Sequence, residues 1–229
     1  MRKCSLLLAC ALTLIASSAG AQTVSGSLDM ANRYLWRGVE QTDGIWFVPT
    51  VTAGRGWLSG AVSADVTATS QQVVLDNANV TLGSSVEWRA LAIEGGVTGY
   101  YAMASLERGS SHELFVVVSR AGLLTPSLEV YHDVQAGDGT YMRLGAEQPV
   151  PLPLPLRRVA LAATAGIAYN RHQWTDRVGW NDASLGVRAG WQARRLDVSP
   201  YVLYSRSLAG RVVPSRVLFG VGIATRTSA

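Results

Sequence analysis

The sequence predicts an all-β fold, a single up-and-down antiparallel transmembrane β-barrel of about 12 strands. Three observations predict it: side chains alternate between two faces along segments of about ten residues, tight links alternate with longer polar segments, and no apolar stretch approaches the roughly 20 residues of a membrane helix. The 229 residues are 48% hydrophobic and 16% charged, whereas an average soluble domain has about 25% charged residues. This composition excludes disorder and disfavours a well-solvated globule.

Residues 1–21 are predicted to be a secretory signal peptide. Arg2 and Lys3 form a basic region, residues 6–15 an apolar region, and residues 19–21 an Ala-Gly-Ala cleavage site. Both cysteines fall in this segment, so we expect neither a disulfide nor a thiolate metal site in the barrel, residues 22–229. Without the peptide the charge drops to 18 basic and 16 acidic residues, too balanced for the basic stripe of a nucleic-acid binder.

The strand signal is clearest in the third predicted strand. Val62, Ala64 and Val66 lie on one face there, and Ser63 and Asp65 lie on the other. The same alternation predicts twelve strands, although boundaries read from a pattern shift by about two to four residues and leave ten or fourteen strands open. The predicted strands are residues 24–33, 46–55, 59–68, 74–86, 91–101, 113–121, 127–135, 141–150, 159–170, 183–193, 196–205 and 216–225.

The connections between these strands alternate in kind. Longer polar segments follow the odd-numbered strands, as at 38–44, 102–112, 136–140 and 171–182. Mostly tight links follow the even-numbered ones, as at 54–56, 122–126 and 194–195. This is the plan of a bacterial outer-membrane barrel, whose short turns face the periplasm. The exception is Pro-rich segment 149–158, which predicts a stiff periplasmic connector or, alternatively, a docking motif for a periplasmic partner.

One face of the predicted strands is apolar and is expected to contact lipid. Its residues are Phe47, Val51, Leu144, Ala146, Leu161, Ile167, Leu185, Val187, Val202, Phe219, Val221 and Ile223. Aromatic residues fall near strand ends and predict the interfacial girdles of such barrels. They are Trp36, Trp46, Trp57, Trp88, Trp174, Trp180, Trp191, Tyr34, Tyr100, Tyr101, Tyr141, Tyr169 and Tyr204.

The opposite face is polar and is expected to line a wet lumen. Its residues are Asp29, Arg33, Asp65, Asn77, Asn79, Glu94, Glu113, Glu129, Arg143, Glu147, Arg188, Asp197 and Tyr201. A dry core would leave a dozen polar groups unsatisfied. Acidic residues outnumber arginines here, which predicts a weak cation preference if the lumen conducts. Alternatively, acid–arginine pairs plug the pore.

The first loop carries a resemblance to a known family. Residues 32–44 read Asn-Arg-Tyr-Leu-Trp-Arg-Gly-Val-Glu-Gln-Thr-Asp-Gly, similar to the Tyr-x-x-Arg-Gly-x-x-Gln-(Ser/Thr)-Asp run of the TorF-type porins, a family of proteobacterial outer-membrane barrels. The matching positions are Tyr34, Arg37, Gly38, Gln41, Thr42 and Asp43. Residues 180–187 resemble the family's late aromatic-x-Asp-x-x-Leu-Gly segment. The resemblance implies an outer-membrane barrel with a porin-like role and implies no substrate.

Two interpretations of this loop remain open. Because it matches the family signature and carries Trp36, Glu40 and Asp43, it is the first place to look for function. The alternative is structural: Arg37 folds back to pair with an acidic lumen or loop residue, and Gly38 supplies a turn.

Enzymatic and metal chemistry have little support in the sequence. The histidines are His112, His132 and His172, and a lipid hydrolase would need a serine such as Ser110 or Ser111 within hydrogen-bond reach of one of them. No G-x-S-x-G, H-E-x-x-H or phosphate-loop motif occurs. We therefore expect no catalytic residue, no cofactor and no metal.

These observations favour an exported, porin-like barrel in the outer membrane of a Gram-negative bacterium. The leading hypothesis is a narrow passive channel for small polar solutes or ions. The alternatives are a closed structural or adhesive barrel that acts through its outer loops, and an outer-membrane lipid hydrolase. The expected partners are outer-membrane lipid and the barrel-assembly machinery, although residues 225–229 lack the terminal aromatic residue that this machinery reads. The sequence does not determine the oligomeric state.

Overall fold

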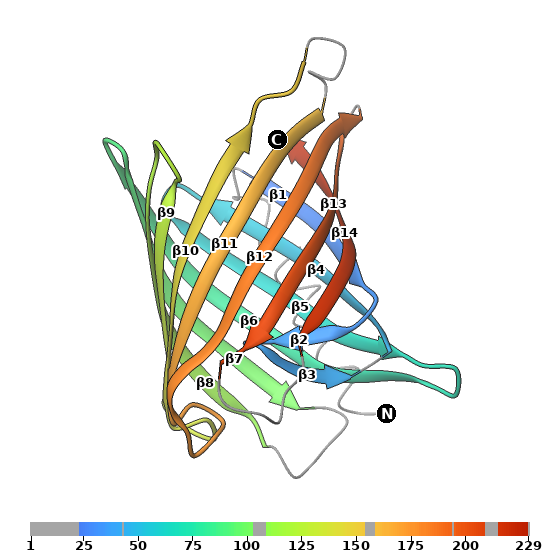
Figure 1. The fold of residues 1–229 in the computed structure, drawn as a ribbon, viewed down its shortest axis with the longest axis vertical. Helices are drawn as coiled ribbons and strands as arrows, with labels where there is room; N and C mark the ends of the chain where they lie inside the picture. The colour runs from blue at the N-terminus through green and yellow to red at the C-terminus, as the bar shows by residue number, and fades with distance from the viewer. Residues whose placement is uncertain are drawn as a thin grey trace.

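The computed structural model is a closed barrel of twelve antiparallel strands, with a separate two-stranded hairpin (Figure 1). It describes residues 23–42, 44–102, 109–153, 159–193, 195–208 and 215–228. The predicted fold class is confirmed. Within these ranges no helix is long and apolar enough to cross a membrane.

The barrel strands are eight to sixteen residues long, well above the five or six that are usual in globular sheets. They are β1 (Thr23–Ala31), β4 (Ile45–Arg55), β5 (Leu58–Ala68), β6 (Val73–Trp88), β7 (Leu91–Ala102), β8 (Ser111–Arg120), β9 (Pro126–Asp133), β10 (Gly139–Val150), β11 (Val159–Arg171), β12 (Val178–Ala193), β13 (Leu196–Ser207) and β14 (Arg216–Ser228). The hairpin strands are β2 (Tyr34–Trp36) and β3 (Val39–Thr42).

Each barrel strand pairs with its neighbours in the chain, and β1 closes the ring. Asp29 of β1 lies opposite Gly222 of β14 on one side and Val48 of β4 on the other. Because every strand has two partners, the barrel has no open edge and its backbone groups can be satisfied without water. Strands β2 and β3 pair only with each other.

All twelve predicted strands correspond to barrel strands, and most ends agree within a few residues. The largest error concerns β12, which begins at Val178, whereas the sequence predicted a loop up to residue 182. The turn-like residues Gly179, Asn181 and Asp182 caused it. The structure accommodates them with a register shift in the β11–β12 pairing between Ala168 and Tyr169.

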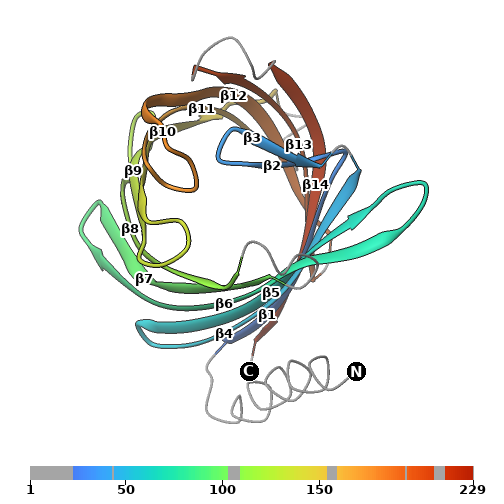
Figure 2. The same ribbon diagram turned by 90° about the horizontal axis from the view of Figure 1, so that it is seen from below.

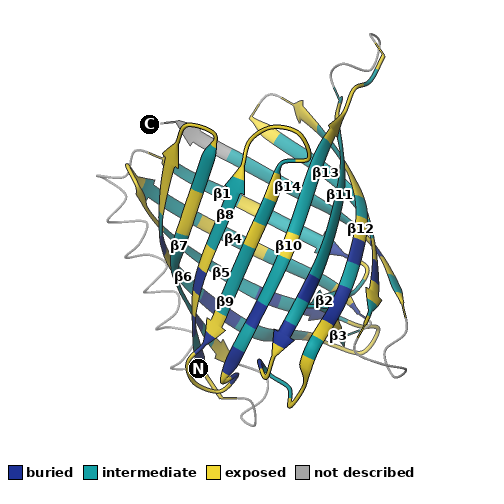
Figure 3. Cartoon of the chain, turned by 60° about the vertical axis from the view of Figure 1, so that its left-hand side comes forward, coloured by how far each residue is buried: buried dark blue, intermediate teal, exposed yellow. Residues whose placement is uncertain are grey.

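Burial in this barrel is the reverse of that in a soluble protein. Among the described residues, buried polar side chains outnumber buried apolar ones, and large apolar residues such as Leu185 and Phe219 are exposed on the outer face. Phe219 is 58% exposed. The buried residues gather towards the hairpin, while exposed and intermediate positions dominate the rest of the wall (Figure 3).

The two ends of the barrel differ. We call the end that carries the β1–β4, β5–β6, β7–β8, β9–β10, β11–β12 and β13–β14 connections the long-loop end, and the opposite one the short-turn end. The β2–β3 hairpin lies across the mouth at the long-loop end, inside the ring of strands (Figure 2). Part of the predicted polar segment 38–44 thus forms strand β3 of this hairpin, within the long connection between β1 and β4.

The expected aromatic girdle is also only partly present. Trp57, Trp88, Trp180 and Trp191 are exposed, as a girdle requires. Trp36, Trp46 and Trp174 instead pack at the mouth. Two of the predicted girdle tyrosines, Tyr100 and Tyr141, also face inward there, where they hydrogen-bond to buried carboxylates. A pattern of strand ends cannot distinguish a ring that faces outward from one that turns into the mouth.

Candidate functional site

The hairpin turns at Arg37 and Gly38, both with positive φ angles of 51° and 75°. Two consecutive residues with positive φ are typical of a two-residue hairpin loop of the I′ type, where glycine is favoured. The turn packs directly on the wall: a Cβ atom on Gly38 would lie 2.6 Å from Cβ of Asp182 in β12. Gly38 is therefore required both by conformation and by the close approach of the hairpin to the wall.

Arg37 at the tip of the hairpin is held by the barrel wall. Its guanidinium donates to Oε1 of Glu113 at 2.7 Å, lies 2.6 Å from Oε2, and also donates to the side chain of Gln173. Its backbone carbonyl accepts from Asn181 at 2.6 Å. The alternative interpretation of this loop is thereby confirmed: Arg37 pairs with an acidic residue of the wall and Gly38 supplies the turn.

Aromatic rings surround the guanidinium of Arg37. Its central carbon lies 4.5 Å from the ring centre of Trp36, 4.8 Å from that of Tyr131 and 5.0 Å from that of Tyr141. All three distances are within the range of cation–π attraction. Arginine is suited to this place because its flat guanidinium stacks on rings and still donates hydrogen bonds in its own plane.

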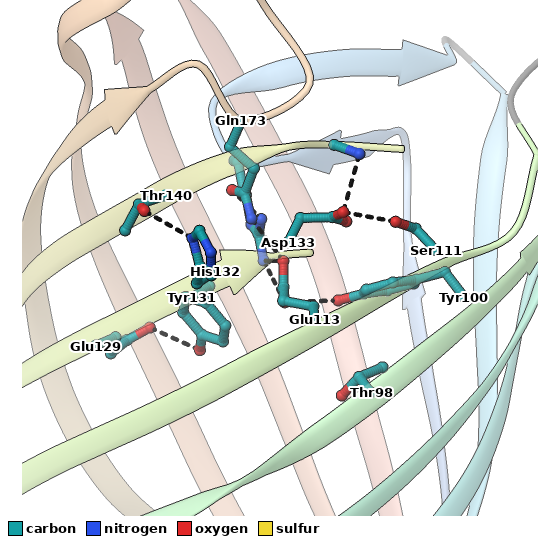
Figure 4. Close-up of polar contacts among 12 residues, drawn as sticks. Thr98, Tyr100, Ser111, Glu113, Glu129, Tyr131, His132, Asp133, Thr140 and Gln173 are labelled. Atoms are coloured by element: carbon teal, nitrogen blue, oxygen red, sulfur yellow. Dashed lines mark hydrogen bonds and ion pairs between the residues drawn. The ribbon is translucent and has the colours of Figure 1, made fainter. Parts of the chain in front are cut away.

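Glu113 is the buried counter-charge, only 1% exposed. Besides Arg37 it accepts from the hydroxyl of Tyr100 at 3.0 Å and from Nε2 of Gln173 at 2.7 Å (Figure 4). The backbone of Gln173 is in turn fixed by Asn170, at 2.9 Å and 3.1 Å. We define the Arg37 seat as Glu113, Gln173, Tyr100, Tyr131 and Tyr141. Breaking a buried ion pair of this kind costs about 3–5 kcal/mol, because one charge is left uncompensated.

A second ion cluster clasps the base of the hairpin. Glu40 of β3 pairs with Arg33 and accepts from Nε of Arg216 in β14 at 2.5 Å. Desolvation by itself would raise the pKa of Glu40, but the hydrogen bonds and charges of Arg216 and Arg33 outweigh it and lower the pKa. The clasp therefore joins the hairpin to the last strand of the barrel.

Ring contacts complete the seating of the hairpin. Tyr34 stacks on Trp46 of β4, with ring centres 4.7 Å apart and planes at 8°. Trp36 meets Tyr100 and Trp174 edge to face, at 6.5 Å and 6.1 Å. Each such pair contributes about 0.5–1.5 kcal/mol beyond burial. The hairpin thus touches the barrel wall on several sides of the mouth.

Two cavities, each lined by both charged and apolar residues, lie behind the hairpin. We call the cavity next to the hairpin the upper cavity and the one nearer the short-turn end the lower cavity. The upper cavity, about 440 Å³, is lined by the hairpin turn and by Tyr141 and Asp182, among others. The lower one, about 630 Å³, is lined among others by Asp29, Arg188 and Tyr201. The two cavities share Glu129, Arg143 and Leu203 in their linings, so they adjoin one another along the β9–β14 side of the barrel.

The polar pairs of the lower lumen run along the wall. Arg143 and Glu129 are direct neighbours on β10 and β9, 2.8 Å apart. Arg188 and Glu147 lie 4.0 Å apart across the intervening β11. Among the described residues, the ion pairs that connect the mouth hairpin to the wall are those of Arg37 and Glu40, so obstruction of the mouth depends on the hairpin.

The structure places the predicted lumen residues in three groups. Those near the long-loop mouth are Arg33, Asp65, Asn77, Asn79 and Glu113. Those around the lower cavity are Asp29, Glu129, Arg143, Glu147, Arg188, Asp197 and Tyr201. Glu94 pairs in register with Ser85 towards the short-turn end. Their role in a pore remains a prediction.

The predicted loop residues separate in the structure. Tyr34, Trp36, Arg37 and Gly38 all contact the wall. Gln41 donates to the carbonyl of Val39 at 3.4 Å. The predicted signal peptide at 1–21, Asp43, residues 103–108 of the predicted polar segment 102–112 and residues 154–158 of the Pro-rich connector lie outside the described residues, as do Arg194 and Ala229.

Sequence reasoning missed most of the Arg37 seat. Tyr131 shares its strand face with the predicted Glu129, and Tyr141 shares its face with Arg143, so strand parity could have placed both rings inward. Gln173 carried no signal, because it lies in a loop and reaches Glu113 from 60 residues away in the chain.

The side chains of His132 and His112 are hydrogen-bonded outside this site. Nδ1 of His132 pairs with Oγ1 of Thr140 at 3.0 Å, and Nδ1 of His112 with Oε1 of Gln135 at 2.8 Å. Ser111, the candidate nucleophile, is buried and donates instead to Asp133 at 2.6 Å (Figure 4). In the described part of the chain no group of three or more acidic, histidine or cysteine side chains is arranged to hold a metal ion.

The comparisons with known proteins identify the fold. No protein-family model and no curated protein match the chain. Among solved structures it is similar to the KdgM porin, alone and in complex with disordered oligogalacturonate, each with TM-score 0.54, 10% identity, and coverage of 89% of this chain and 98% of that chain. The translocator domain of autotransporter NalP from Neisseria meningitidis also matches, with TM-score 0.46, 13% identity, and coverage of 99% and 98%. The likeness to the KdgM porin shows the fold, a closed antiparallel β-barrel of the kind that this porin has.

We expect Gly38→Ala to release the hairpin while the barrel stays closed. The new Cβ would meet Asp182 at 2.6 Å and would also strain the turn, with about 1–2 kcal/mol from the positive φ alone. Trypsin should then cut the folded, detergent-solubilised barrel after Arg33 or Arg37. Gly56→Ala is the matched control, because Gly56 has a similar φ of 61° but nothing within 4 Å. Equal cutting in both variants would argue against the packed seat.

Acid should loosen the base of the hairpin. Because the pKa of Glu40 is lowered in the folded protein, its contribution to seating is complete above the ordinary value near 4.5 and is lost as the pH falls through the folded value. Tryptophan fluorescence should report this acid transition, since Trp36 and Trp46 pack on or beside the hairpin. Glu40→Gln should lose that component of the titration, and a titration identical to the wild type would contradict the clasp.

Proposed function

We propose that this protein is a porin-like barrel of the outer membrane, a narrow passive channel for small polar solutes or ions. The observation that carries the proposal is the pair of adjoining cavities, both with charged residues in their linings, inside a closed twelve-stranded barrel. Twelve strands give a lumen between filled eight-stranded barrels and open sixteen-stranded porins. The mouth hairpin narrows this lumen at the long-loop end, which faces the outside in such barrels.

The outer face supports a membrane location. Large apolar residues of several strands are exposed there, including Leu82, Leu144, Leu185, Val202 and Phe219. A soluble monomer rarely exposes a contiguous apolar surface above a few hundred Å². Outer-membrane lipid is therefore the proposed surrounding, and the barrel-assembly machinery the proposed route of insertion.

The charges of the lumen favour cations. The arginines at the mouth and lower cavity are paired, whereas the lumen holds further acids: Asp182 accepts from hydroxyl and amide groups, Asp197 lines the lower cavity, and Asp29 accepts from Tyr201 and shares Arg188 with Glu147. A surplus of one sign in a confined lumen raises the local concentration of the opposite ion. We therefore expect the channel to prefer cations.

A closed barrel that acts through its outer loops is the second candidate. The observation in its favour is the mouth hairpin, which is fixed by Arg37, Glu40 and stacked rings. We favour the channel because the ion pairs of the lower lumen join residues of nearby strands along the wall. They therefore leave the space of the two cavities open. A lipid hydrolase has less support, since His132 and His112 are paired with Thr140 and Gln135.

The resemblance to the TorF-type porins stays a proposal of kinship. It is carried by the hairpin sequence from Tyr34 to Gln41, which the structure shows at the mouth. The KdgM porin has been solved with disordered oligogalacturonate, but a likeness at 10% identity concerns the fold. We therefore carry over no solute from it.

Recording single-channel current in a planar bilayer tests the channel. We expect discrete conductance steps and a reversal potential shifted towards the cation in a salt gradient. Arg37→Ala should raise the unit conductance or the open fraction, because it removes the ion pair that holds the hairpin tip against the wall. A folded barrel that stays silent in both forms would favour the closed alternative, and an anion-shifted reversal would contradict the charge argument.

The membrane location predicts unequal costs for two arginines on one strand. Val202→Arg places a charge on the outer face among Val187 and Phe219, and should lower the free energy of unfolding in lipid by about 2–4 kcal/mol if the position is near the bilayer centre. Ser199→Arg is the control, because Ser199 shares its strand face with Tyr201, which bonds to Asp29 in the lumen. Urea or guanidinium titration of refolding into vesicles measures both. Equal costs would contradict a lipid-facing outer surface.

A further inference from the structure

The Arg37 seat belongs to the barrel wall, whereas its occupant does not. Glu113, Tyr131 and Tyr141 stand on β8, β9 and β10, which are fixed by continuous ladders. Arg37 stands on a hairpin whose strands pair only with each other. If the hairpin moves, Arg37 and Trp36 leave together, and the wall keeps Glu113 together with the two tyrosine rings on which the guanidinium was stacked.

The empty seat would be a built cation site. Glu113 is 1% exposed and Tyr141 4% exposed, and Tyr100 and Gln173 hold the carboxylate in place at 3.0 Å and 2.7 Å. A buried carboxylate beside aromatic faces attracts a cation with a weakly hydrated head, such as guanidinium or alkylammonium. Arg37 shows that a guanidinium fits there, with its central carbon about equally far from both rings.

We infer that the Arg37 seat binds organic cations of the guanidinium or alkylammonium class, and that Arg37 is its tethered competitor. The inference rests on the proposed channel and names the class of solute that it admits. A cation that enters the seat takes the place of Arg37 and so favours the unlatched hairpin. The same site thereby recognises the solute and opens its path.

The surroundings of the seat favour a cation over an anion. An anion would have to displace Glu113, which stands on a barrel strand and keeps two hydrogen-bonding partners, Tyr100 and Gln173, when Arg37 leaves. The upper cavity beside the seat adds Asp182, whose carboxylate accepts from Tyr141 and Asn181 at 3.2 Å and 2.9 Å. Its arginine other than Arg37, Arg143, is paired with Glu129 at 2.8 Å.

Tethering explains why the wild-type seat should bind a free cation weakly. A group held on a short segment competes at an effective concentration in the millimolar range or above. Removing its guanidinium should therefore raise the affinity for a free cation by about tenfold or more. This increase distinguishes a ligand site from a purely structural latch, which would gain no affinity.

The test is a binding titration with methylguanidinium as the probe. Saturation-transfer NMR of its methyl signal would compare the wild-type protein with Arg37→Ala, both folded in deuterated detergent. The matched control is Arg89→Ala, because Arg89 also lies over a ring, 4.9 Å from the centre of exposed Trp88. We expect Arg37→Ala to bind at least about tenfold more tightly than the wild type, and Arg89→Ala to match the wild type.

Two further variants in the Arg37→Ala background locate the site. Glu113→Gln removes the charge, and Tyr131→Leu removes one ring while leaving the charge. Each should return the affinity to the wild-type level or below, with folding verified by circular dichroism. Tyr131→Leu keeps the test decisive if the Glu113 variant does not fold. No gain in Arg37→Ala, or a gain for acetate in place of methylguanidinium, would overturn the inference.

Binding in micelles and current in bilayers separate the two proposals. Tight binding by Arg37→Ala with no current in any form would support the seat and overturn the channel. Current without a gain in binding would support the channel and overturn the seat. If both proposals hold, methylguanidinium added on the hairpin side should increase the open fraction of the wild-type channel and leave that of Arg37→Ala unchanged.

Discussion

The contact between Arg37 and Glu113 is the most deeply buried of the ion pairs that hold the hairpin in the barrel mouth. The ring of strands closes through backbone hydrogen bonds alone, so the barrel itself does not depend on this pair. Glu113, however, is buried, and a buried carboxylate without a counter-charge is costly. Arg37 supplies that charge from a hairpin whose strands lie outside the barrel ladder. The mouth is therefore narrowed by an electrostatic requirement of the wall and not by the fold.

The polar side chains of the lumen accordingly do two different things. Pairs such as Arg143 with Glu129 link neighbouring strands, satisfy each other and keep to the wall. The pairs of Arg37 and Glu40 join the hairpin to strands β8 and β14 and so bring a segment into the mouth. Sequence patterning shows only that the residues are charged and share a face. Whether a pair supports the wall or obstructs the lumen depends on which element carries each partner.

The fold could be predicted from the sequence because side chains along a strand have a period of two. Val62 and Asp65 already sort onto opposite faces without any tertiary information, and the predicted segment 59–68 lies within β5. The hairpin could not be predicted in this way, since β2 and β3 have three and four residues. Arg37 also meets Glu113 across 76 residues of chain. Local pattern allowed such a pairing but could not choose the partner.

The hairpin is poised for exchange because it has little stability of its own. A two-stranded hairpin is marginal in water at best, so its position depends on the contacts of Arg37, Glu40, Tyr34 and Trp36 with the wall. Any ligand that competes for one of these contacts shifts the balance between seated and released forms by its difference in affinity for the two. Because the guanidinium of Arg37 makes the most deeply buried of these contacts, competition at its seat has the greatest effect on the mouth.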